Sequence, residues 1–329
     1  MVKKLPIFIL AGSDQKGGPV PVNMTEQDML RGYKGAILLP NGKTLAQELI
    51  DRMRASGVFG EICLIGPATI YESVVDCDVI DVEGKLPVVF ESLRQAMYEK
   101  CDPGSHVAIC ACDILPTAEE FQRLIETDFS SQASSKIWWQ LVRADEKAMG
   151  ASDWKQAYQL LPTPGDESPV PYYPGHLVVL KPDSLRLRLI NQLLALSYKY
   201  RNRTIRNRFW PMSLEGGWEL VKQDVFGILQ GKLPKLTWTV FSQCLLGLVS
   251  YRRRKMSVTE FESRLGKLFV HREERGPRSV VVAETPYVSF AKDFDSHVEL
   301  KELLQNLGAA DDVHPGENPQ RGAGGPKQP

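Results

Sequence analysis

The feature that most limits the fold is a set of short apolar runs with little polar alternation. Residues 5–10 read LPIFIL, residues 61–67 read EICLIGP, and residues 106–113 read HVAICACD. A strand with one solvent-facing side alternates apolar and polar residues, whereas a strand buried on both sides stays apolar. The runs are shorter than ordinary helices, so they predict buried strands of a mainly parallel sheet.

Segments with helical spacing lie between these runs. Residues 44–56 place Leu45, Leu49, Ile50 and Met53 at helical spacing, with Thr44 as the expected N-cap and Gly57 as the stop. A weaker strand is expected over residues 78–82. A helix is expected over 87–99, with Val88, Leu93 and Met97 facing inward, and another over 117–126, capped by Thr117. Strands that alternate with helices predict an α/β fold whose sheet is covered by helices on both faces.

The rest of the chain divides into three parts. Residues 136–181 contain three short strand-like runs, and the proline-rich stretch 162–175 between them reads as a surface loop. Residues 182–268 have helical spacing, and a strand over 278–290 and a helix over 291–308 follow. We expect a nucleotide-binding core over 1–181, a mostly helical region with a returning strand over 182–308, and a disordered tail over 309–329, which has almost no large apolar residues.

Composition excludes some classes of protein. The 329-residue chain has 40 basic and 40 acidic residues, so no global field attracts nucleic acid or an anionic membrane. The basic stretch 198–210 contains aromatic residues, but a solvated or acceptor-binding helix end explains it better than RNA binding. The apolar stretch 236–251 is too short and too polar to span a bilayer. The initial apolar run is too short for a signal peptide, so we expect a cytoplasmic protein with no nucleic-acid or membrane partner.

The six cysteines are expected to be reduced, buried thiols. Cys110 and Cys112 form a C-x-C pair on one apparent strand, so their side chains share a face. A metal site would need two further ligands at suitable spacing, and none is evident nearby in the sequence.

Two features stand at the carboxyl ends of predicted strands, which is where ligands bind in open parallel sheets. Residues 9–18, ILAGSDQKGG, run from a strand into a glycine-containing loop, whose backbone N–H groups could hold a phosphate. A plain turn is the alternative. Asp113 follows a buried strand, where its carboxylate could bind Mg²⁺, although it could instead cap the next helix. Lys34 could meet a phosphate as a point charge or be an ordinary solvated lysine.

Together these motifs resemble a known family. The Leu10-Ala11-Gly12 loop, the later Lys34, the segment NGKTL before a helix, and the strand that ends at Asp113 in CDILP look like nucleotidyltransferases related to molybdenum-cofactor guanylyltransferase and to sugar-phosphate nucleotidyltransferases. The resemblance covers residues 5–130, and more loosely 136–181 and 278–303. It implies a Rossmann-like, mainly parallel sheet of the nucleotide-diphospho-sugar transferase kind, followed by a helical C-terminal part.

The resemblance also implies roles for individual residues. Leu10, Ala11, Gly12 and Ser13 would embrace the nucleotide, Lys34 would contact phosphate, and Asp113 would hold Mg²⁺. The usual pattern has a glycine where Ser13 stands, followed by an arginine and a lysine within a short loop. Here the loop up to Lys34 is long, and either Lys16 or Arg31 would supply the missing charge. Asp293 and Asp295 would provide a further metal ligand, or else they are the acidic residues common in a first helical turn.

The activity implied by the resemblance is Mg²⁺-dependent transfer of a nucleoside monophosphate from an NTP to a small phosphorylated acceptor, with release of pyrophosphate. Two alternatives remain open at the level of sequence. One is a glycosyltransferase that uses a nucleotide sugar on the same kind of fold. The other is a non-catalytic nucleotide-binding protein, which the altered loop after Leu10 would suit. Fold alone does not choose among these activities.

Overall fold

The computed structural model describes residues 4–13, 20, 25–83, 86–144, 149, 157–200, 215–218, 220–222, 224–226, 228–229 and 236–311. Its strands are β1 Leu5–Leu10, β2 Phe59–Gly66, β3 Asp78–Asp81, β4 Val107–Ala111, β5 Ile137–Arg143, β6 Tyr158–Leu160, β7 Val170–Leu180 and β8 Val280–Thr285. They form one eight-stranded sheet in the order β3-β2-β1-β4-β7-β5-β8, and β6 pairs with β7. Only β7 runs antiparallel to its neighbours along this order, so the sheet is mainly parallel.

The helices are α1 Leu45–Ser56, α2 Ala68–Tyr71, α3 Leu86–Lys100, α4 Ala118–Arg123, α5 Leu187–Tyr200, α7 Leu236–Arg252, α8 Val258–Phe269 and α9 His297–Asp311. A π-helical turn, Leu124–Phe129, continues α4, and short 3-10 turns include η2 Lys34–Ala36 and η7 Val288–Phe290. The described residues between 215 and 229 are also helical. Within the described ranges, no helix has both the length and the apolar character needed to cross a membrane.

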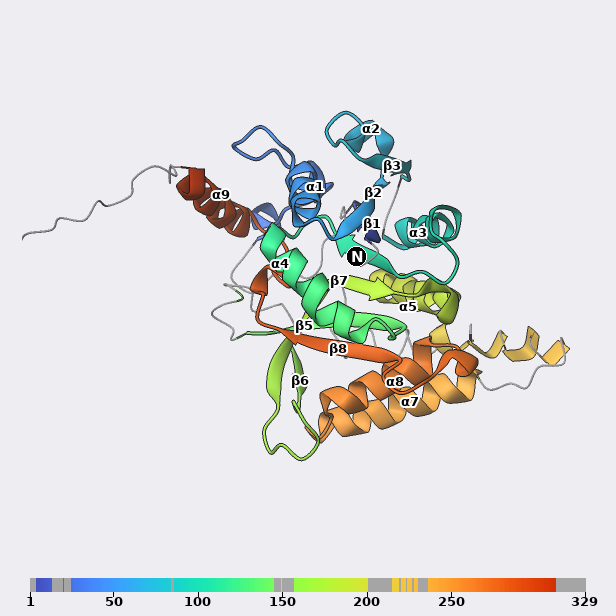
Figure 1. The fold of residues 1–329 in the computed structure, drawn as a ribbon. Helices are drawn as coiled ribbons and strands as arrows, with labels where there is room; N and C mark the ends of the chain where they lie inside the picture. Colours follow the sequence, from blue (N-terminus) through green and yellow to red (C-terminus); the bar gives the residue numbers. More distant parts are fainter. Residues whose placement is uncertain are drawn as a thin grey trace, which may run out of the picture.

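Helices cover both faces of the sheet (Figure 1). Side chains of α1, α4 and α9 pack on one face, and side chains of α3, α5 and α8 pack on the other. Helix α7 packs against α8 and lies farther from the sheet. The predicted α/β class with helices on both faces and a helical C-terminal part is therefore confirmed. The sheet also takes β8 from the later part of the chain, next to β5.

Strand β1 shows why the apolar runs are unbroken. Ile7 and Ile9 belong to the core beneath α1, whereas Phe8, which points the other way, belongs to the core beneath α3. All three are fully or almost fully buried. Because neighbouring residues of a strand point to opposite faces, a strand with helices above and below it has no position for a polar side chain.

The expected cap and stop of α1 and the expected cap of α4 are confirmed, whereas helical structure after α4 continues past residue 126 to Phe129. The Thr44 side chain accepts a hydrogen bond from the backbone N–H of Gln47 at 3.2 Å, and Gly57 ends α1 with a φ of 72°. Thr117 forms a capping box with Glu120 at the start of α4. These local contacts satisfy backbone groups that have no partner inside the helix.

The stretch 162–175 is not a loop throughout. Its second half belongs to β7, which begins at Val170 and includes two prolines of the stretch. Pro171 pairs with Gln159 of β6, and Pro174 lies at the register shift of β5. Proline cannot donate to a ladder but is accepted at edges and irregularities, so both positions suit it. The buried rings of Tyr172 and Tyr173 hold the strand in place.

Several smaller expectations were wrong. Val88 of α3 is exposed, and its neighbour Val89 lies in the core instead, one helical turn before Leu93. The expected strand over 278–290 ends at Thr285, just before a proline, and gives way to η7. Helix α9 runs on to Asp311, beyond the expected start of the tail, while residues 312–329 lie outside the described ranges.

The six cysteines are free, as expected, but they are not all buried. Cys63, Cys110 and Cys112 are buried, whereas Cys244 of α7 is exposed. Cys110 and Cys112 lie in the same core cluster, on the face covered by α1. The expectation of buried thiols therefore fails at Cys244, and it holds only in part at Cys77 and Cys101, which are half-buried.

Replacing Gly175 of β7 tests how tightly the side chain of Gln140 packs against this strand. A Cβ placed there would lie 2.4 Å from Cγ of Gln140, whose side chain is fully buried. We expect Gly175→Ala to lower the free energy of unfolding by about 1–3 kcal/mol, because the Gln140 side chain must move within a packed core. Urea unfolding would measure this loss.

Gly60→Ala in β2 is the matched control, because its nearest contact, Cβ of Lys4 at 3.4 Å, leaves room for a methyl group. The loss caused by Gly175→Ala should shrink when Gln140→Ala is also present. Equal losses in both backgrounds would contradict the packing explanation.

Candidate functional site

Asp113 lies at the carboxyl edge of the sheet, two residues beyond the end of β4. Strand β4 runs parallel to β1, with Ala111 opposite Leu10. The backbone N–H of Cys112 donates to the carbonyl oxygen of Leu10 at 3.2 Å, so pairing with β1 continues just past β4. Asp113 therefore projects from the edge that the sequence predicted, next to the segment that follows β1.

Asp113 does not cap the following helix. The cap of α4 is Thr117, whose side chain accepts from the backbone N–H of Glu120 at 3.2 Å. The carboxylate of Asp113 instead contacts the ammonium group of Lys34 at 3.2 Å. The capping alternative for Asp113 is wrong.

Lys34 is buried, with 7% of its side chain exposed, so the alternative of a solvated lysine is also wrong. It opens η2, and its ammonium group forms ion pairs with Asp113 and Asp295. Gly35 allows this position, because a Cβ there would lie 3.1 Å from the Tyr71 hydroxyl and 3.2 Å from Sγ of Cys112. A larger residue at 35 would push η2 away from β4, and Lys34 with it.

Asp293 and Asp295 come from the segment between η7 and α9. The backbone N–H of Phe294 donates to the carbonyl oxygen of Asp113 at 3.1 Å, and the N–H of Leu30 donates to the carbonyl of Asp295 at 2.8 Å. Helix α9 begins at His297, so both aspartates precede it and neither lies in its first turn. Backbone hydrogen bonds thus fix this segment to the end of β4 and to the segment before η2.

Sequence reasoning missed two residues that hold Asp295. The carboxylate of Glu299, itself buried, accepts from the backbone N–H groups of Asp295 at 2.9 Å and Ser296 at 3.1 Å. The Glu299 N–H in turn donates to the Ser296 hydroxyl at 3.2 Å. Serine followed three residues later by glutamate is the signature of a capping box, so the pattern was visible in the sequence. His176 of β7 also approaches the group, with its Nε2 4.0 Å from the Asp293 carboxylate.

The three aspartates form one compact group. One carboxylate oxygen from each of Asp113, Asp293 and Asp295 lies within 4.8 Å of the others. Burial would lower the pKa of Lys34, but the nearby carboxylates of Asp113, Asp295 and Asp293 outweigh it and raise that pKa above its ordinary value. Burial and the neighbouring Asp293 raise the pKa of Asp295, against the opposing effect of Lys34. Lys34 alone therefore does not balance the negative charge of the group.

The group suits a hard divalent cation. Mg²⁺ binds oxygen ligands, of which carboxylates are the usual protein source. The ion pairs of Lys34 use Oδ2 of Asp113 and Oδ1 of Asp295, which leaves the second oxygen of each carboxylate for a cation. A cation beside Lys34 would also relieve the excess negative charge. The donor set and its charge fit a metal site at the edge of the sheet.

The segment predicted to embrace a nucleotide lies beside this group. The N–H of Ala11 donates to the carbonyl of Ile65 at 2.9 Å, which fixes the exit of β1 against β2. Ala11 and Ser13 are buried, whereas Leu10 and Gly12 are partly exposed. Residues 14–19, which include Lys16, lie outside the described ranges. Arg31 is described and half-buried.

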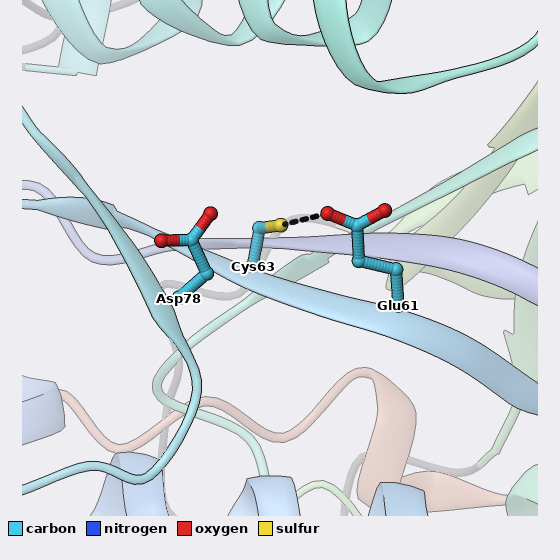
Figure 2. Close-up of side chains that lie close together, drawn as sticks. All are labelled: Glu61, Cys63 and Asp78. Carbon is cyan, nitrogen blue, oxygen red and sulfur yellow. Dashed lines mark hydrogen bonds between the residues drawn. The ribbon is translucent and has the colours of Figure 1, made fainter.

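A second group of possible metal ligands, drawn in Figure 2, lies elsewhere. Glu61 and Cys63 belong to β2, and Asp78 begins β3. Lys100 of α3 forms ion pairs with both Glu61 and Asp78. Burial raises the pKa of the Cys63 thiol to about 12, and the thiol donates to Glu61 at 3.5 Å. A protonated thiol and two exposed carboxylates that already have a cationic partner indicate a structural network.

No family model matches the sequence, and no curated protein matches it. Solved structures do. One described as a hypothetical transferase from Thermus thermophilus is 18% identical, covers 91% of this chain and 100% of its own, and has a TM-score of 0.53. CMP:2-keto-3-deoxy-manno-octonic acid synthetase complexed with CTP is 9% identical over 94% of this chain and 100% of its own, with a TM-score of 0.48. A 4-diphosphocytidyl-2C-methyl-D-erythritol synthase from Anaerococcus prevotii is 13% identical over 60% of this chain and 76% of its own, with a TM-score of 0.34.

The likeness to the Thermus thermophilus structure, which extends over most of both chains, concerns the fold. A shared fold does not determine the activity, which depends on the residues of the site.

The charge balance at Lys34 can be tested through stability. We expect Lys34→Met to lower the free energy of unfolding by about 3–5 kcal/mol in the presence of EDTA, because the carboxylates of the site lose their buried counterion. Added Mg²⁺ should recover more stability in this variant than in the wild-type protein. Urea unfolding with and without Mg²⁺ would measure both effects.

Lys43→Met is the control, because Lys43 pairs with Asp51 at an exposed position. That variant should unfold like the wild-type protein. A Lys34→Met variant as stable as the wild type would show that the ammonium group is not needed to balance the carboxylates.

Proposed function

We propose that the protein is an Mg²⁺-dependent nucleotidyltransferase, an enzyme that moves a nucleoside monophosphate from an NTP to a small phosphorylated acceptor and releases pyrophosphate. The observation that carries the proposal is the gathering of Asp113, Asp293 and Asp295 around Lys34 at the carboxyl edge of a mainly parallel sheet. This edge is where such sheets bind their ligands. The fold shared with a protein described as a transferase agrees with it.

In this proposal Asp113, Asp293 and Asp295 hold Mg²⁺, with Asp113 as the ligand supplied directly by β4. The bound ion would neutralise negative charge on the phosphates as the reaction proceeds. The protein's own contribution is to keep the carboxylates in place before the substrate arrives. The Phe294 N–H, bonded to the carbonyl of Asp113, and the Glu299 carboxylate do this for the two segments that meet here.

Lys34 contributes a second positive charge near the phosphates. An ammonium group has three N–H donors, and two of them point to Asp113 and Asp295. The third would donate to a phosphate oxygen of the NTP. Because both carboxylates orient the side chain, the ammonium group is held in place before binding and loses little freedom when a phosphate arrives.

The segment Leu10–Ser13 would line the nucleotide on the other side of the carboxylates. It leaves β1 at the same edge as Asp113, and its backbone is fixed to β2 through Ala11. In phosphoryl transfer the protein mainly positions the reactants and stabilises charge, with little covalent work. Transfer then needs only that the acceptor phosphate oxygen lie in line with the bond between the α-phosphate and the leaving pyrophosphate.

The metal role of Asp113 can be tested by Asp113→Asn, which keeps the shape of the side chain and removes its charge. We expect the loss of Mg²⁺-dependent NTP binding, measured by calorimetry with each of the four NTPs. The melting temperature should change little, because removing one carboxylate from a group with excess negative charge relieves repulsion while Lys34 keeps its contact with Asp295.

Asp78→Asn, in the second group of possible ligands, is the matched control and should bind NTPs like the wild-type protein. Unchanged Mg²⁺-dependent binding by Asp113→Asn would rule out its metal role. Pyrophosphate release from an NTP with a panel of phosphorylated acceptors would support nucleotidyl transfer. Hydrolysis of a nucleotide sugar without pyrophosphate release would favour a glycosyltransferase, and tight binding without turnover on any acceptor would favour a non-catalytic protein.

A further inference from the structure

Helix α7 has an unusual outer face. A surface helix normally presents polar residues to solvent and buries an apolar stripe. In α7 the exposed side chains before the terminal Arg252 are apolar, and four of them follow helical spacing on one face: Trp238, Phe241, Leu245 and Val249. Trp238 is 71% exposed. The opposite face, which carries the buried Val240 and Gly247, packs towards α8. The outer face is therefore fixed away from the core.

The described residues between 215 and 229 extend this surface. Val225, Phe226, Ile228 and Leu229 are exposed, the last by 79%. A groove between this segment and α7 is lined by residues of both, among them Val221, Ile228, Trp238 and Phe241. We call the exposed apolar residues of 218–249 the apolar patch. Soluble monomers rarely expose a large contiguous apolar surface, so the patch indicates contact with a partner or a membrane.

The basic composition of the chain around the apolar patch indicates which kind of partner it meets. Residues 218–255, which include the whole apolar patch, contain seven lysines or arginines and two acidic residues, although the whole chain has no net charge. One of the two, Asp224, is engaged, because its carboxylate accepts from the backbone N–H groups of Leu236 at 3.1 Å and Thr237 at 2.8 Å at the start of α7. Four of the basic residues, 252–255, are exposed where α7 ends.

We propose that the apolar patch docks on an anionic phospholipid surface. Trp238, Phe241 and Leu245 would enter the boundary between headgroups and acyl chains, as the apolar face of an interfacial helix does. Basic residues at 252–255, together with Lys222, would bind the lipid phosphates. Helix α8 packs against the inner side of α7, so α7 would lie in the plane of the membrane with only its outer face in contact with lipid.

A second copy of the chain fits the apolar patch less well. In a two-fold symmetric dimer the patch would face itself, which would bring two strongly basic surfaces together. On an anionic lipid surface the repulsion is replaced by attraction, because each basic residue faces a negative charge. The expectation from the sequence that the protein meets no membrane rested on the lack of a spanning segment and on the charge of the whole chain, which conceals this local excess.

Vesicle sedimentation of the full-length protein tests the proposal, with phosphatidylcholine vesicles prepared with and without phosphatidylglycerol. We expect binding that requires phosphatidylglycerol and weakens as salt is added. Trp238→Ser combined with Phe241→Ser should lower the binding constant by roughly tenfold or more. Arg252→Gln combined with Arg253→Gln should reduce the preference for the anionic vesicles.

Two control variants change residues of the same kinds elsewhere. Val88→Ser with Tyr98→Ser removes exposed apolar side chains of α3, and Arg123→Gln with Lys301→Gln removes exposed basic ones. Both should bind vesicles like the wild-type protein, and all variants should keep its melting temperature. Equal losses in the controls, or no binding of the wild-type protein to either vesicle, would overturn the proposal. So would a wild-type dimer in sedimentation velocity that Trp238→Ser with Phe241→Ser turns into a monomer, because a second copy would then cover the patch.

Discussion

The ion pairs of Lys34 with Asp113 and Asp295 are the interaction on which the edge of this sheet depends. A buried ammonium group is costly unless carboxylates surround it, and here the carboxylates come from the end of β4 and from the segment before α9. Contact with Lys34 therefore brings together three segments that are far apart in the chain. If these segments moved apart, each would keep a charged side chain without its partner.

Supporting contacts make this arrangement rigid. Gly35 allows η2 to approach Cys112, and Glu299 binds the backbone on which Asp295 sits. Sites whose side chains are held by such neighbours lose little freedom on binding, which favours both affinity and rate. The same neighbours prevent the carboxylates from moving apart to reduce their repulsion. The excess negative charge that remains is what makes a divalent cation a suitable ligand.

The neutral composition of the chain conceals two opposite local charges. The carboxylate group at the sheet edge is negative, whereas residues 220–255 are strongly basic. The first belongs to a largely buried site, and in our proposal it binds a metal ion that in turn meets the phosphates. The second borders the exposed apolar surface of α7, which we propose meets a lipid headgroup layer. A net charge sums over both and therefore excludes neither kind of ligand.

The sequence by itself determined the elements governed by local rules. The apolar run of β1, the cap at Thr44 and the position of Asp113 after a buried strand all follow from neighbouring residues. The sequence suggested Lys34 and Asp295 separately, through resemblance, but not their contact across 261 positions of the chain. It also did not reveal that the outer face of α7 is apolar, or that the second half of the proline-rich stretch forms part of strand β7. Only the tertiary structure decided these, because each depends on which distant segment lies alongside and which side chains remain uncovered.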